Sequence, residues 1–456
     1  MTLERIHALR SHFENGRTRD LAVRRAALKK LRTAIKRNEE ALLAAMHADM
    51  RKPRFEAYLS DIGLVLAAID EAIANLKEWA APTSVPTPLA IQVAESSIRK
   101  EPLGVVLVIA PWNYPVLLLL GPLVGAIAAG NCVALKPSEE VPATSAVVER
   151  IINESFDPEN VCVIQGKGHE VVPALMQGFR FDHVFFTGSG PVGKRVLAQA
   201  APHLVPVTLE LGGKSPAIVD RSADVHVAAK RIAWSKFFNA GQTCIATDHA
   251  MVHASVVEEF VDHFIRSVRK AYSDDPRSSP HFARLINERR FAVVRSYLDQ
   301  GRVCLGGQSE AGDRYIAPTL LLDVAMDAPV MCEEIFGPVL PLIPWTEREE
   351  VVSLTQRNPY PLASYLFSSD RSMPNWFIER IASGSTCINH CMLHFGNPHL
   401  PFGGVGNSGM GRYHGRYTFD LFSHHRSLVK ASTLIDHGLQ EPPYTKLKEG
   451  VLRRVL

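Results

Sequence analysis

The sequence has little cysteine and almost no net charge, and these two features exclude some classes of protein. It holds 7 cysteines in 456 residues, an odd and scattered set that argues against a disulfide framework and for a reducing, cytoplasmic compartment. The 50 basic and 47 acidic side chains leave a net charge of +3, too small to indicate a nucleic acid partner. The first residues are charged and helical, so we expect no signal peptide.

One long stretch lacks charge altogether, because no charged residue occurs between Glu101 and Lys136. Such a run could suggest a membrane span. Pro111, Pro115 and Pro122 split it into pieces too short to cross a bilayer. We therefore expect no membrane span.

Short apolar strands alternate with helices over most of the chain. Residues 104–110 and 131–135 predict buried strands joined by an apolar helix over 116–129, which is typical of a parallel sheet covered on both faces. Further strands are predicted at 161–165, 183–187, 205–211 and 249–253, and further helices at 224–238 and 255–270. The predicted fold class is α/β, with two doubly wound parallel-sheet domains.

Helices are predicted before the first strand. Residues 3–50 predict one or two amphipathic helices with a break at Gly16, and 55–79 predict another. A proline-rich linker follows at 81–88. The loose alternation over 89–101 predicts strands that leave the domain before returning.

Two motifs combine a thiol with a carboxylate. Cys244 ends the run Gly-Gln-Thr-Cys, and Glu210 ends an apolar strand beside Gly212 and Gly213, which would give Glu210 room to move. A lone cysteine is usually a small buried hydrophobe. A thiol and a carboxylate that converge on one carbonyl carbon can form a thioester and then hydrolyse it with activated water. The second motif therefore favours catalysis.

A glycine-rich loop follows the strand at 183–187. Gly188, Ser189 and Gly193 belong to a G-x-G-x-x-G pattern that leads into a helix, whose free amides can receive a pyrophosphate. The same fingerprint normally includes an acidic residue about twenty positions further on. Glu210 lies near that place, so it could be a ribose ligand or a catalytic base.

Cysteine and histidine also gather near the C-terminal third of the chain. Cys387, His390, Cys391 and His394 match no standard zinc spacing, and no second ligand pair lies nearby. We therefore expect no metal there.

Five motifs together resemble the aldehyde dehydrogenase family. The nucleophile and base motifs, GQTC and ELGG, are joined by Pro-Trp-Asn-Tyr-Pro at 111–115, Lys-Pro-Ser-Glu at 136–139 and Glu-Ile-Phe-Gly-Pro at 334–338. They occur in the family's order over about residues 105–410. The resemblance implies the fold of that family, with a small β bridging element that serves oligomerisation.

The resemblance also implies a role for each site residue. Cys244 would attack the aldehyde, Glu210 would activate water, and the Asn113 amide would donate to the oxyanion. The residues expected to hold NAD or NADP are Trp112, Lys136, Glu139, Gly188, Ser189, Val192, Glu334 and Phe336. The residues expected to contact the aldehyde are Tyr114, Phe238, Thr243, His394 and Phe402.

The C-terminal segments resemble the class 3 branch of the family. That branch oxidises aromatic and medium- to long-chain aliphatic aldehydes and is typically dimeric, so we expect a homodimer. The resemblance implies a cofactor domain over 1–82 and 102–209, a catalytic domain over 210–398, and a bridging element over 83–101 and 399–456. Three alternatives remain: an acylating dehydrogenase, against which Glu210 argues; a direct alcohol or hydroxy-acid dehydrogenase with Glu210 as ribose ligand; and a member without turnover that has a structural or binding role.

Overall fold

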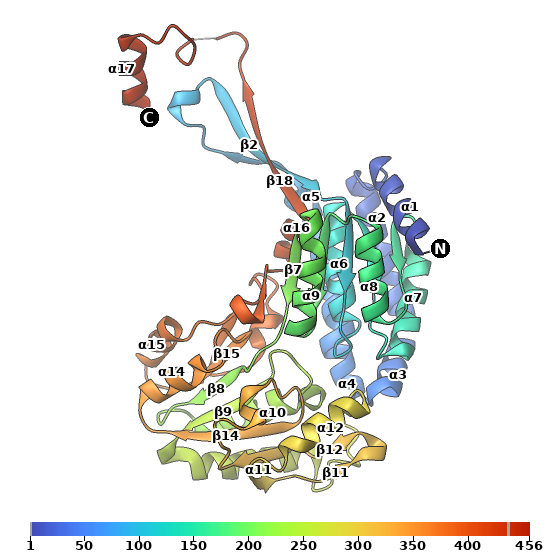
Figure 1. The fold of residues 1–456 in the computed structure, drawn as a ribbon, viewed down its shortest axis with the longest axis vertical. Coiled ribbons are helices and arrows are strands. Elements are labelled where there is room, and N and C mark those ends of the chain that lie inside the picture. Colours follow the sequence, from blue (N-terminus) through green and yellow to red (C-terminus); the bar gives the residue numbers. More distant parts are fainter. Residues whose placement is uncertain (1, 436–437) are drawn as a thin grey trace.

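The computed structural model describes residues 2–435 and 438–456. Figure 1 shows two α/β bodies and a thin ribbon that projects from one of them. Each body is built on a mostly parallel sheet. Within the described part of the chain, no helix combines the length and the apolar character needed to cross a bilayer.

The first body contains a six-stranded sheet with the order β17-β7-β6-β3-β4-β5. Its strands are β3 (Val105–Ile109), β4 (Cys132–Lys136), β5 (Val161–Val163), β6 (His183–Thr187), β7 (Val207–Glu210) and β17 (Gly409–Met410). All neighbours pair in parallel except β17, which runs antiparallel to β7. The carboxyl ends of the parallel strands therefore meet at one edge, where ligands bind in such sheets.

Helices cover both faces of this sheet because successive side chains of a strand point to opposite sides. On β3, Val105, Leu107 and Ile109 face one apolar layer, whereas Val106 and Val108 face the other. The first layer is completed by α1 (Thr2–Glu14), α8 (Gly168–Gly178) and α9 (Gly190–Ala200). The second is completed by α2 (Leu21–Arg37), α3 (Glu39–Met50), α5 (Gly63–Ala80), α6 (Leu117–Ala129) and α7 (Pro142–Ser155).

The second body contains a seven-stranded sheet with the order β10-β13-β14-β9-β8-β15-β16. Its strands are β8 (Pro216–Val219), β9 (His249–His253), β10 (Arg302–Leu305), β13 (Thr319–Leu322), β14 (Val339–Trp345), β15 (Ala363–Phe367) and β16 (Ser385–Ile388). Its helices include α10 (Val225–Phe237), α11 (Val257–Tyr272), α12 (Glu288–Tyr297), α13 (Pro329–Cys332), α14 (Arg348–Gln356) and α15 (Met373–Arg380). Only β10, at the edge, pairs antiparallel.

The projecting ribbon is an antiparallel sheet of three strands. It consists of β1 (Thr83–Val85), β2 (Ala94–Pro102) and β18 (Ser423–Ala431), in the order β1-β2-β18. Figure 1 shows β2 and β18 running away from the first body toward α17 (Lys446–Val455). The strands predicted to leave the domain near 89–101 belong to this ribbon.

Three local features differ from the sequence-based expectation. The segment 3–50 forms three helices, because the chain breaks at Asn38 as well as near Gly16. The Asn38 side-chain amide donates to the carbonyl of Ala34 at 2.9 Å, which ends α2. Each parallel sheet also gains a short antiparallel edge strand, β10 or β17, that was not predicted.

Candidate active site

A tight turn between α10 and β9 presents the nucleophile. Asn239 and Ala240 both adopt left-handed backbone conformations with φ of 52°. Gly241 follows at φ 76°, and a Cβ atom there would lie 2.3 Å from the carbonyl oxygen of Gly337. Non-glycine residues in this region carry strain, which persists at functional sites when the surroundings hold it. The turn places Cys244 against an apolar cavity.

Cys244 is half-buried, and its thiol is protonated at neutral pH. Burial, assisted by the Glu334 and Glu210 carboxylates, raises the pKa of the thiol to about 12. The thiol must therefore lose its proton to a base before it can attack a carbonyl carbon. Those same carboxylates are close enough to influence the thiol electrostatically.

Glu210 is the last residue of β7, where its backbone pairs with Thr187. The side chain is buried, and among the described residues neither carboxylate oxygen has a hydrogen-bond partner. Burial raises the pKa of this carboxyl well above its ordinary value. β6 and β3 separate β7 from β4, the strand that ends in Lys136. This separation favours the base over the ribose ligand.

Asn113 lies in the loop after β3 and is held from two sides. Its amide nitrogen Nδ2 donates to the carbonyl of Gln242 at 3.0 Å, which leaves one amide hydrogen for another acceptor. The backbone carbonyl of Asn113 accepts hydrogen bonds from Lys52 Nζ and Asn239 Nδ2, each at 3.1 Å. Lys52 is fully buried and pairs with Asp61 at 2.6 Å. The loop is therefore anchored beside the nucleophile turn.

Four of the five predicted aldehyde contacts line one cavity with Cys244, of about 180 Å³. These four are Tyr114, Phe238, Thr243 and Phe402. The Tyr114 hydroxyl and the Thr243 hydroxyl share a short hydrogen bond. This bond leaves the cavity wall almost wholly apolar.

His394 does not line that cavity. Its Nδ1 atom lies 3.1 Å from Cys387 Sγ, and its ring stacks on Phe402 with centroids 5.9 Å apart. Burial lowers the pKa of His394 to about 4, so the ring is neutral at physiological pH. His394 therefore supports the wall from behind, through Phe402.

The remaining wall residues did not stand out in the sequence. They come from the π-helical segment before α5, from α5, α6 and α10, from the residue after Cys244, from the segment 392–396 and from position 413. Trp234 could have been found, because it precedes Phe238 by one helical turn and so shares its face. The additional wall residues are Leu59, Ser60, Leu64, Leu117, Leu118, Trp234, Ile245, Met392, Leu393, Phe395, Gly396 and Tyr413.

The glycine-rich loop and the strand ends nearby offer a dinucleotide cradle. Gly188 follows β6, and Ser189 precedes α9 without capping it through its side chain. Beside Gly190 a Cβ atom would meet nothing within 4 Å, so the start of α9 is uncrowded; Pro191 has no N–H, and the Val192 amide donates to the carbonyl of Ser189 at 3.1 Å. Val192, in the first turn, is exposed. Free helix amides are the donors that a pyrophosphate takes.

Lys136 and Glu139 lie at the end of β4 and already contact each other. Lys136 Nζ is buried and lies 3.0 Å from Glu139 Oε2. Glu139 Oε1 accepts from the backbone amide of Gly168 at 2.7 Å, at the start of α8. Burial acts against ionisation of Glu139, but Gly168 and Lys136 outweigh it and hold the pKa of that carboxyl below its usual range. Both groups fit ribose hydroxyls as donor and acceptor.

The loop that carries Glu334 and Phe336 reaches the same region from the second body. Phe336 adopts φ 42°, and its ring packs edge-on against Trp112 at 5.4 Å between centroids. Arg290 holds the loop by donating to the carbonyls of Glu334 and Phe336, each at 3.3 Å. Burial raises the pKa of Glu334 to about 7. A Cβ atom at Gly212 would lie 2.4 Å from the Glu334 carboxylate, so this glycine gives room to Glu334.

A buried ion pair fixes the other side of that loop. Lys214 Nζ pairs with Asp248 and donates to the carbonyls of Val330 and Glu333, each at 2.8 Å. Asp248 Oδ2 in turn accepts from the amide of Ile335 at 2.9 Å. Lys214, which belongs to the same motif as Glu210, thus connects that segment to the loop that carries Glu334.

A parallel-sheet dinucleotide site beside a half-buried thiol and a buried carboxylate is the arrangement of a dehydrogenase that holds its substrate on cysteine. The model of the aldehyde dehydrogenase family matches residues 4–428, and the chain belongs to this family. Its activity is the NAD(P)-dependent oxidation of an aldehyde, so the predicted fold, enzyme class and cofactor are confirmed.

Individual relatives agree with this assignment. 4,4'-Diaponeurosporen-aldehyde dehydrogenase of Staphylococcus aureus is 44% identical over 443 residues, which cover 97% of this chain and 96% of that protein. Aldehyde dehydrogenase family 3 member B2 of Mus musculus is 45% identical over 441 residues, 96% of this chain and 92% of that protein. The structure of Staphylococcus aureus AldH in a substrate-bound state has a TM-score of 0.97 at 42% identity and covers 100% of this chain and 99% of that one.

An NAD+ complex also occurs among the similar structures. An indole-3-acetaldehyde dehydrogenase with NAD+ has a TM-score of 0.86 at 28% identity, covering 94% of this chain and 88% of that chain. The class 3 resemblance is likewise confirmed, because family 3 members of Mus musculus and Homo sapiens are 45% and 43% identical to this chain.

Proposed function

We propose that this chain oxidises aromatic or medium- to long-chain aliphatic aldehydes to carboxylic acids on Cys244. The observation that carries the proposal is the apolar cavity of about 180 Å³, which holds the Cys244 thiol at its wall. Burying each methylene group contributes about 0.8 kcal/mol, which favours longer aldehydes about fourfold per carbon while the cavity has room. A polar or very small aldehyde gains little from such a wall.

The first chemical step forms a carbon–sulfur bond. The Cys244 thiol gives its proton to the ionised form of Glu210, which is a stronger base than an ordinary carboxylate because burial raises its pKa. The sulfur then attacks the aldehyde carbon, and the carbonyl electron pair moves to oxygen. The free amide hydrogen of Asn113 and the backbone N–H of Cys244 donate to that oxyanion.

The second stage converts the thiohemiacetal to an acid. Collapse of the oxyanion restores the carbonyl, expels a hydride and leaves a thioester on Cys244. When bound, NAD or NADP supplies the hydride acceptor. Glu210 releases its first proton to solvent and then takes one from the water that attacks the thioester. The carbon–sulfur bond breaks, Glu210 returns its proton to the Cys244 sulfur, and the acid leaves.

We propose that the cofactor lies across the edge of the first sheet. Lys136 and Glu139 would bind the adenosine ribose, and Gly188, Ser189 and Val192 would bound the pyrophosphate at α9. On the other side, Glu334 would bind the nicotinamide ribose, while Phe336 and Trp112 would pack against the ring. The open space beside Gly190 and the charged pair at Lys136 support this placement.

Domain roles follow the two sheets. We assign cofactor binding to 1–82 and 102–209 and catalysis to 210–398, although residue 1 lies outside the described part. β17 joins the first sheet, and α16 (Arg416–Leu421) contacts α6. We therefore restrict the bridging element, first placed at 83–101 and 399–456, to 83–101 and the segment from 423 onward, of which 436 and 437 lie outside the described residues.

We also propose a homodimer in a reducing, cytoplasmic compartment. The outer edge of β18 is unpaired within the described sheet, and its residues after Ser423 are exposed. Such an edge is a template for pairing with a second chain. The cysteines are all free, which suits a reducing compartment.

An aldehyde panel of increasing chain length tests the proposal. NADH or NADPH formation is followed by absorbance, and the product is identified by mass spectrometry. We expect kcat/KM to rise with chain length until the cavity is filled, and the product to be the free acid. Equal kcat/KM for all chain lengths would contradict the assigned substrate class, and a product that forms only with an added thiol acceptor would indicate an acylating enzyme.

A further inference from the structure

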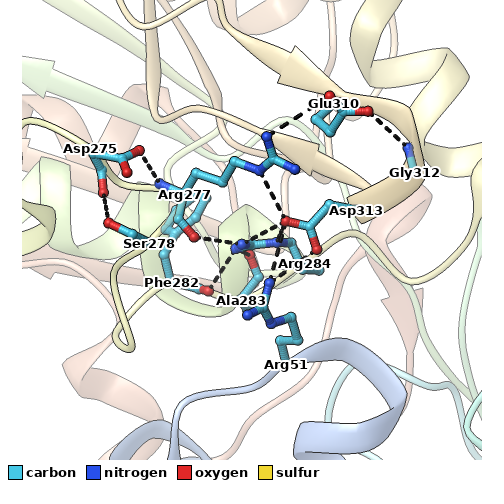
Figure 2. A network of polar contacts seen from close by, with 10 residues as sticks. All are labelled: Arg51, Asp275, Arg277, Ser278, Phe282, Ala283, Arg284, Glu310, Gly312 and Asp313. Carbon is cyan, nitrogen blue, oxygen red and sulfur yellow. Dashed lines mark hydrogen bonds and ion pairs between the residues drawn. The ribbon is translucent and has the colours of Figure 1, made fainter.

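Three arginines converge on one carboxylate outside the site described above. Asp313, at the end of the turn between β11 (Ser309–Glu310) and β12 (Tyr315–Ile316), accepts from Arg51 at 3.0 Å, Arg277 at 3.4 Å and Arg284 at 3.0 Å. Figure 2 shows this Asp313 cluster, which consists of these four residues. Arg51 follows α3 of the first body, so the cluster joins both bodies.

Arg284 is the buried member of the cluster and fixes the path of its own segment. Its side chain is 1% exposed. Besides Asp313, it donates to the carbonyls of Arg277 at 2.7 Å and Phe282 at 3.1 Å (Figure 2). Its backbone amide donates to the carbonyl of Met50 at 2.8 Å. The guanidinium therefore sets where the backbone of residues 282–286 lies against the first body.

That backbone holds the side chain of Gln242, two residues before the nucleophile. Gln242 Nε2 donates to the carbonyl of Arg284 at 3.0 Å, and Oε1 accepts from the amide of Ile286 at 3.0 Å. Nε2 also donates to the carbonyl of Asn239 at 3.1 Å, within the strained turn. The side chain of Gln242 is fully buried and its polar atoms are all engaged. Its position is thus dictated by residues 284–286.

The backbone of Gln242 then holds the oxyanion donor, because its carbonyl accepts from Asn113 Nδ2 at 3.0 Å. We propose that Gln242 is a positioning residue for Asn113, and that the Asp313 cluster sets the place of Gln242. This inference rests on the proposed function, in which the second amide hydrogen of Asn113 stabilises the oxyanion. Removing an oxyanion donor costs about 10²–10³ in rate, and a displaced donor loses part of that.

The variant Asp313→Asn tests the chain of contacts. The amide keeps the size of the side chain but removes the charge that the three arginines share. We expect the rate of the first turnover of NADH formation to fall about tenfold, with unchanged affinity for NAD. Asp323→Asn is the matched control, because Asp323 forms one exposed ion pair with Arg302 at 2.7 Å in the same body. We expect no change in that control.

A double-mutant cycle separates positioning from general loss of structure. In an Asn113→Ala background the donor is absent, so Asp313→Asn should slow the first turnover no further. If Asn113→Ala alone leaves the rate unchanged, the oxyanion assignment in the proposed function fails. If Asn113→Ala slows the reaction but Asp313→Asn has no effect, or has its full effect in both backgrounds, the positioning role is overturned.

A milder variant covers the case in which Asp313→Asn does not fold. Arg277→Lys changes a half-exposed member of the cluster and removes its 3.4 Å contact with Asp313. We expect a two- to threefold slower first turnover, a smaller part of the oxyanion contribution, again absent when Asn113 is replaced. Equal slowing in both backgrounds would refute the inference in the same way.

Discussion

Replacing Glu210 by Gln should stop the enzyme after one turnover. The amide has nearly the same size as the carboxyl, and no hydrogen bond to either oxygen is lost among the described residues. The cavity and the cofactor cradle should therefore survive the change. What disappears is the proton acceptor that the attacking water needs.

General-base catalysis contributes about 10²–10⁴ in rate, so the steady-state kcat of Glu210→Gln should fall by that factor. Hydride transfer precedes the hydrolysis step, so a burst of about one NADH per Cys244 should remain, formed more slowly than in the parent because Glu210 also accepts the thiol proton. In the parent enzyme kcat should rise as pH rises through the pKa of Glu210, which burial places well above 4.5. In the variant this rise should be absent.

The same pKa shift predicts a change in stability. Burial favours the protonated carboxyl in the folded state, so raising the pH above the unfolded pKa, near 4.5, should progressively destabilise the parent protein. Glu210→Gln should abolish this loss. Its Tm should match the parent near pH 4.5 and exceed it by a few degrees at pH 8.

Stopped-flow absorbance and cofactor titration by fluorescence decide between the two interpretations of Glu210. A burst with normal NAD affinity supports the base. Weak NAD binding without a burst would mean that Glu210 holds the ribose, and the assignment of the glycine-rich loop would then be wrong.

Three further changes test the site. Cys244→Ser should lower turnover at least 10³-fold with cofactor affinity retained, because a hydroxyl is a poor nucleophile near neutral pH, and near-normal NADH production would exclude a covalent mechanism. Glu139→Gln should raise the NADP to NAD ratio of kcat/KM about two- to fivefold, a modest effect because Lys136 already neutralises the carboxylate, and an unchanged ratio would place Glu139 away from the ribose. Lys52→Met should remove about 3–5 kcal/mol of unfolding free energy by leaving Asp61 charged and buried, measured by guanidinium denaturation, whereas a loss below 1 kcal/mol would contradict the buried pair.

The sequence predicted the apolar interior of the sheets well. β6 and β9 have the bounds that the apolar runs at 183–187 and 249–253 predicted, and α10 lies within one residue of its predicted ends. The two strands are buried on both faces, so composition and length suffice to recognise them. The antiparallel strand β17 was missed because two residues, Gly409 and Met410, carry no periodic pattern.

The sequence predicted the motif residues of the candidate site but not most of the residues that line its cavity. The motifs singled out Cys244, Glu210 and Asn113 as candidates, because each lies in a short run whose chemistry is local. The cavity wall was harder to predict, since it is assembled from segments far apart in the chain. His394 illustrates the limit: its place in a loop gave no sign that the ring would turn toward Cys387 and stand behind Phe402.

The high pKa of Cys244 also bears on how the enzyme survives oxidants. Peroxides and alkylating reagents attack the thiolate, and a thiol of pKa about 12 is ionised in only about one molecule in 10⁵ at pH 7. The thiol is therefore unreactive toward such reagents before substrate binds, chiefly because it is buried and secondarily because Glu334 and Glu210 lie nearby. Cys332 is the exposed one of the seven cysteines and is therefore the thiol that such reagents should modify first.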